Sequence, residues 1–60
     1  MYKIVGIIEE NGVKVAHNIR CNTDPFIKAS NMGFTHGWIT KGQSDEIIAI
    51  INDDGTIYEV

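Results

Sequence analysis

The run of five aliphatic residues from Ile47 to Ile51 constrains this chain most, because 60 residues offer little material to cover it. Four of the five are isoleucine, whose branched Cβ is restricted in a helix and fits well in a strand. A short run without polar residues is typical of a strand that is covered on both faces. Ser44 could instead cap a helix with Asp45 in its first turn. We favour the strand.

The run continues into a β-hairpin through the turn Asn52–Gly55. If residues 53–55 form the loop, with Gly55 in the left-handed conformation, Ile51 faces Ile57 and Ile50 faces Tyr58. A two-residue loop would instead place Ile50 opposite Glu59. The first register gives better cross-strand pairs, each worth about 0.2–1 kcal/mol, and is the one we expect.

A second hairpin is predicted over residues 2–20, around the type I′ turn signal Asn11-Gly12. Its register pairs Glu9 with Lys14 and Ile4 with Ile19. The face that we expect to join the core carries Ile4, Ile8, Val15 and Ile19. The opposite face has an apolar centre, Val5, Ile7 and Ala16, inside a rim of Lys3, Glu9, Lys14 and Arg20. Such a composition is typical of a protein interface, although a half-covered sheet face is an equally good interpretation.

The only good helix signal spans residues 23–33. Asp24 or Thr23 caps it, Pro25 occupies its first position and Gly33 ends it. The stripe of Phe26, Ala29 and Met32 is expected to dock on the core face of the first hairpin.

A third strand is expected from Phe34 to Thr40, and regular alternation would place Phe34, His36 and Trp38 on one side. These three residues form a candidate ligand or partner surface. In the competing interpretation, Phe34 and Trp38 are core residues with Tyr58 packed against them.

The plan ββαβββ predicts one α+β domain, residues 1–60, with an antiparallel sheet of four to five strands and one short helix on one face. A small five-stranded β-barrel is the alternative, because closure would also cover the Ile run. A chain of this length buries only about 60% of its unfolded surface. The single cysteine, Cys21, excludes an internal disulfide, so self-association is the expected source of further burial.

Composition disfavours several function classes. The net charge is −3 and the five basic residues are scattered, so we do not expect nucleic-acid binding. No membrane span or signal peptide is recognisable, and one free thiol fits the cytoplasm. His17, Cys21 and His36 could suggest a metal site, but residues 17 and 21 of one strand lie about 13 Å apart. We expect no metal, no cofactor and no enzymatic activity.

We therefore expect a non-enzymatic cytoplasmic interaction protein, a homodimer, that binds and modulates another macromolecule. Phages and mobile elements often encode inhibitors of this size. The candidate oligomer or partner surface comprises Val5, Ile7, Ala16, Ile48 and Ile50. The alternative is a protein that binds a small ligand or nucleotide near His36 and Trp38, at a subunit interface.

Overall fold

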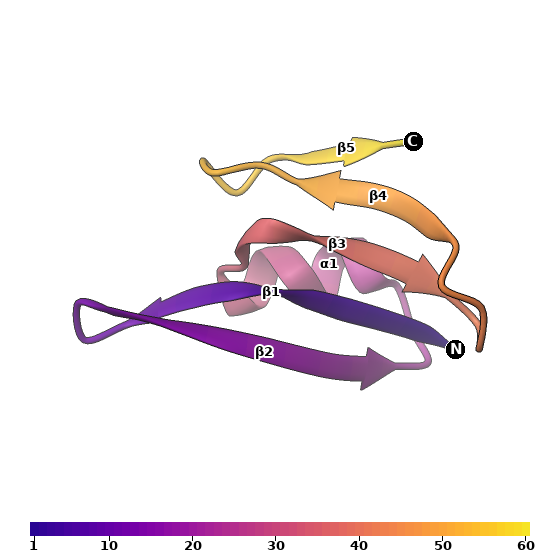
Figure 1. Cartoon of the computed structure of the whole chain (residues 1–60), viewed down its shortest axis with the longest axis horizontal. Coiled ribbons are helices and arrows are strands. Elements are labelled where there is room, and N and C mark those ends of the chain that lie inside the picture. Colours follow the sequence, from indigo (N-terminus) through magenta and orange to yellow (C-terminus); the bar gives the residue numbers. More distant parts are fainter.

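The computed structural model describes all 60 residues as five strands and one helix in the order ββαβββ (Figure 1). The elements are β1 (Tyr2–Glu10), β2 (Val13–Cys21), α1 (Pro25–Met32), β3 (Thr35–Lys41), β4 (Ile47–Ile51) and β5 (Ile57–Glu59). All neighbouring strands are antiparallel, in the order β2-β1-β3-β4-β5. The predicted α+β class is confirmed. The barrel alternative was wrong, because β2 and β5 do not pair and remain the two edges of an open sheet.

Both hairpins have the registers that their turns predict. In the first, Glu9 pairs with Lys14, and the turn residues Asn11 and Gly12 have φ angles of 52° and 79°, as a type I′ turn requires. In the second, Ile51 pairs with Ile57 across the three-residue loop that ends at Gly55. The Ile run is therefore a strand.

Helix α1 begins and ends at the predicted residues. The Asp24 carboxylate accepts a hydrogen bond from the Phe26 amide at 2.9 Å, which satisfies a free N–H of the first turn. Gly33 ends the helix in the left-handed conformation. The helix packs mainly against β1 and lies behind β1 and β3 in Figure 1. Its buried stripe is narrower than expected, because Met32 is 37% exposed while Ala29 is buried.

The core lies between α1 and one face of the sheet. Its seven buried hydrophobic residues come from four strands or loops and the helix: Ile4, Ile8, Ala29, Phe34, Ile39, Ala49 and Ile51. Ala49 and Ile51 of β4 are buried, and Ile48, the extra residue where the pairing with β3 shifts between Ile39 and Thr40, also packs against the core. Ile50 is half-buried on the opposite face, and Ile47 is 42% exposed. The chain alone therefore covers one face of the strand, and coverage of the other face by a second chain stays a prediction.

A bulge in β3 changes which side chains reach the core. Gly6 of β1 pairs with Gly37, but its neighbour Ile7 pairs with Thr35, so His36 is an extra residue with a left-handed φ of 59°. The alternation is thereby interrupted. Phe34 enters the core at 2% exposure, whereas Trp38 is 41% exposed and lies on the other face. The prediction that Phe34, His36 and Trp38 share one side was wrong.

Candidate functional site

The face of the sheet that α1 leaves uncovered carries a continuous apolar row, and we call this face the open face. Val5 pairs with Trp38, Trp38 pairs with Ile50, and Ile50 pairs with Tyr58. Directly paired residues of an antiparallel sheet project to the same side. The row therefore crosses four strands, β1, β3, β4 and β5, without a polar residue.

The open face exposes large apolar side chains. Trp38 is 41% exposed and Tyr58 66% exposed, and Val5 and Ile50 beside them are half-buried. Ile7 extends the patch along β1. Contiguous exposed apolar surface of this kind marks interaction sites in soluble proteins.

The structure brings together the two halves of the predicted partner surface. Val5, Ile7 and Ala16 of the first hairpin lie on the same face as Ile50, because β3 connects the two hairpins. Ile48 was predicted to belong to this surface but packs against the core. Trp38 stands at the centre of this face. Of the predicted aromatic surface, only Trp38 belongs to it.

The open face differs in charge from the rest of the molecule. Lys3, Lys14 and Arg20 lie on it with one acid, Glu9, as their cross-strand pairs show. The Asp45 carboxylate of the β3–β4 loop lies 3.8 Å from Lys3 Nζ at the rim, so these five residues together carry a formal charge of +1. The whole chain carries −3, so the remaining surface is acidic. The basic side chains flank the apolar row on the β1–β2 side.

His36 lies at the bulge, away from Trp38. Its Nδ1 atom forms an ion-pair contact with the Asp53 carboxylate of the β4–β5 turn, and its side chain is 69% exposed. A cavity of about 300 Å³ beside it is lined by Ile7, Lys14, Thr35, His36 and Asp53. Trp38 does not line this cavity, so the predicted pair of His36 and Trp38 is not brought together there.

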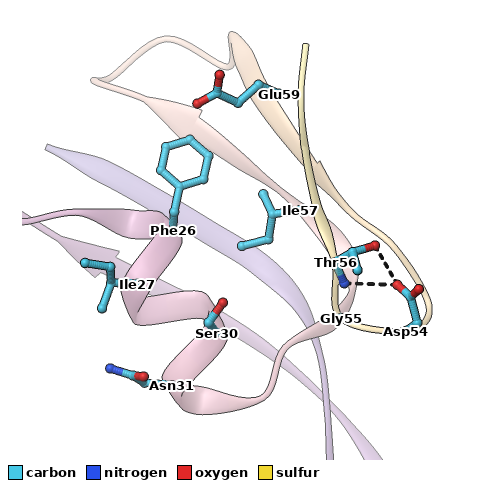
Figure 2. A pocket seen from close by; sticks show the side chains of 9 residues that line it. All are labelled: Phe26, Ile27, Ser30, Asn31, Asp54, Gly55, Thr56, Ile57 and Glu59. Carbon is cyan, nitrogen blue, oxygen red and sulfur yellow. Dashed lines mark hydrogen bonds between the residues drawn. The ribbon is translucent and has the colours of Figure 1, made fainter.

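A second feature lies on the helix side, between α1 and the β4–β5 hairpin. Figure 2 shows Phe26 and Ser30 of the helix facing Ile57 of β5, with Glu59 farther along the strand. The hollow between them has a volume of about 870 Å³. We call it the helix-side groove. Sequence reasoning missed it, although the single short helix predicted for five strands was a signal that part of the sheet would stay uncovered.

Asp54 borders the helix-side groove as an ionised carboxylate. The hydroxyl and the amide of Thr56 both donate to its Oδ1 atom, at 2.6 and 3.0 Å (Figure 2). These hydrogen bonds favour the charged form and lower the pKa of Asp54 from 3.8. The groove therefore keeps a negative charge at one end at neutral pH.

The residues considered for metal binding are held in other contacts. His17 Nε2 lies 3.1 Å from Glu10 Oε1, and the His17 ring meets the Phe34 ring edge-on at 6.3 Å between centroids. Cys21 Sγ donates to the Thr23 carbonyl at 3.7 Å. No group of three or more His, Cys, Asp and Glu side chains converges to form a metal site. No helix has the length and apolar character needed to span a membrane.

Comparisons with protein-family models, curated proteins and solved structures gave no significant match.

Proposed function

We propose that this chain is a non-enzymatic cytoplasmic interaction protein that forms a homodimer and binds and modulates another macromolecule. The observation that carries the proposal is the apolar row Val5–Trp38–Ile50–Tyr58 on a sheet face that nothing in the chain covers. Burial of this face against a second copy would supply the apolar contact that a 60-residue chain lacks.

The size of the open face is adequate for a dimer. The molecule measures 32 × 19 × 18 Å, so the open face offers about 600 Å² per copy, or about 1,200 Å² in total, at the lower end of specific interfaces. The face combines an apolar centre with charged residues at its rim, as such interfaces do.

The order of the strands makes this face self-complementary. A two-fold axis parallel to β3, the middle strand, would place Trp38 against Trp38 of the second copy and Val5 against its Ile50. The same rotation brings the β2 edge over β5, where Asn18, which pairs with Val5 at the end of the row, lies opposite Tyr58. This arrangement places no like charges opposite each other, because neither β4 nor β5 carries a charged residue on the open face.

Light scattering after size exclusion tests the dimer. At micromolar concentration we expect a species of twice the chain mass of 6.7 kDa. Trp38 is the only tryptophan, so its fluorescence reports coverage of the open face directly. Its emission should shift to longer wavelength as dilution dissociates the dimer.

Two substitutions that introduce the same charge distinguish disruption of the dimer interface from a general effect of added negative charge. Ile50→Glu places a carboxylate on the open face and should yield a monomer. Val13→Glu places one at the tip of the first hairpin, where Val13 is already 60% exposed, and should leave the dimer intact. A monodisperse 6.7 kDa species for the unmodified chain would refute the dimer. Affinity capture from the native host, followed by mass spectrometry, identifies the macromolecular partner.

The cavity beside His36 supports a second candidate function, the binding of a small ligand or nucleotide. Ile7 and Lys14 line the cavity and lie on the open face, so it would open toward the dimer interface. Native mass spectrometry of freshly purified protein tests this function. A bound mass that is lost in His36→Ala while the dimer persists would favour it, and ligand-free protein would count against it.

A further inference from the structure

The sheet is wider than its single helix can cover. Strands lie about 4.8 Å apart, so five strands span about 19 Å, whereas a helix with its side chains is about 10 Å across. Helix α1 packs mainly against β1 and lies behind β1 and β3 (Figure 1). Ala49 and Ile51 of β4 are still buried in the core, so the uncovered strip on this side lies along β5, next to α1.

The helix-side groove occupies this strip, and its lining is apolar in the middle and acidic at the ends. Phe26 of α1 and Ile57 of β5 face each other across it, and both are only partly buried (Figure 2). Asp54 and Glu59 bracket Ile57 along the hairpin. None of the nine lining residues is basic. Its volume of about 870 Å³ is close to that of two helical turns of about 5.4 Å pitch.

We infer that the helix-side groove binds an amphipathic α-helix of a partner protein, with an apolar stripe that packs on Phe26 and Ile57 and with Lys or Arg side chains that meet Asp54 and Glu59. This inference deepens the proposed function, on which it rests, by giving the chemistry of the macromolecular partner. A helix that binds in a groove contacts it through apolar residues at i, i+3, i+4 and i+7, and charged residues beside this stripe fix the orientation of the helix.

A second copy of this chain fits the groove less well than a basic helix does. The only helix in the chain, α1, has eight residues and a single basic side chain, Lys28. It therefore offers one charge to the two acids. In the proposed dimer the open faces meet, so the helix-side grooves face outward and stay accessible.

The test uses the full ¹⁵N-labelled chain and two synthetic helical peptides of equal length. Both carry Leu at i, i+3, i+4 and i+7; one has Lys at the remaining positions and the other has Glu. The Lys peptide should shift the amide resonances of Phe26, Ser30, Ile57 and Glu59 and bind at least about tenfold more tightly than the Glu peptide.

Charge reversal provides the matched control. Glu59→Lys should abolish the preference for the Lys peptide, whereas Glu9→Lys, the same change on the open face, should preserve it. Because both variants have the same net charge, general attraction between a basic peptide and an acidic protein would affect them equally.

Several results would overturn the inference. These are the absence of groove shifts with about 1 mM Lys peptide, shifts confined to the open face, and equal effects of the two charge reversals. If the resonances of the groove residues move on dilution without peptide, a second copy of the chain occupies the groove. This result would also overturn the inference. Repeating the titration with Ile50→Glu separates the two proposals, since groove binding should persist in a monomer and dimerisation should persist in Glu59→Lys.

Discussion

At the scale of single residues, the absence of side chains at two glycines organises both faces of the sheet. A Cβ on Gly37 would lie 2.1 Å from the Val5 carbonyl oxygen, so β1 and β3 can approach as they do only if residue 37 is glycine. A Cβ on Gly6 would lie 3.0 Å from the Phe34 ring, which occupies the space above that residue. These contacts hold Phe34 in the core beside the bulge.

Gly37→Ala should therefore prevent folding. The clash is with backbone, which cannot rotate away, and we expect a loss of about 3 kcal/mol or more from a domain of small total stability. Gly12→Ala is the matched control, because its Cβ would meet nothing and only the left-handed φ of 79° is strained, at about 1 kcal/mol. Urea unfolding followed by circular dichroism measures both. Equal stability of the two variants would contradict this account.

The aromatic residues show where prediction from sequence ended. The turn residues Asn11 and Gly55 have strong backbone preferences, and these were sufficient to predict both registers. The prediction for residues 34–40 assumed that side chains alternate regularly along the strand. The left-handed conformation of His36 interrupts this alternation, so the prediction failed. A left-handed histidine is uncommon and has no local sequence signal. The bulge lies directly beside the pair of Gly6 and Gly37, residues far apart in the sequence.

At the scale of elements, the two hairpins and the helix were predictable because their determinants are local: turn residues, caps and apolar periodicity. The order of the strands was not, since β3 inserts beside β1 and connects the hairpins through contacts distant in sequence. For the same reason each half of the open face was predictable separately, Val5 and Ile7 from one hairpin and Ile50 from the other. Their union around Trp38 required the structure. Ile48 was assigned to this face by regular alternation, which the register shift beside it interrupts.

The β4–β5 turn allows a prediction about protonation. Thr56→Val removes the hydroxyl that donates to Asp54, so the pKa of Asp54 should rise toward 3.8, while Thr56→Ser should keep it low. Because the folded-state pKa is the depressed one, this carboxylate contributes stability that is present above pH 3.8 and is lost as the pH falls. A pH titration of the Asp54 carboxyl ¹³C resonance measures the shift. An identical titration curve for the Val and Ser variants would exclude the hydroxyl as its cause.

At the scale of the whole molecule, the fold has two faces of different character. One bears a helix and an acidic groove, and the other bears an apolar row with basic side chains at its rim. Only 11 of the 60 residues are buried, so the isolated chain has a small core. Additional burial at the open face would then contribute a large part of the stability.

Stability should accordingly depend on concentration. If the open face is buried in a dimer, the thermal midpoint of the unmodified chain should rise by several degrees over a hundredfold increase in protein concentration, as mass action requires. Ile50→Glu should remove the dependence and Val13→Glu should retain it. Differential scanning calorimetry at several concentrations measures the midpoint. A constant midpoint for the unmodified chain would show that folding does not depend on association.

The unequal lengths of the two edge strands have a consequence for aggregation. Edge-to-edge growth of sheets into fibres needs two complementary borders, one on each side of every molecule. Here β2 offers nine residues but β5 only three. Pairing of β2 with β5 of another copy would therefore join at most three residues, whereas pairing of two β2 edges would join up to nine. The unequal borders thus disfavour head-to-tail growth of the sheet and favour a closed pair.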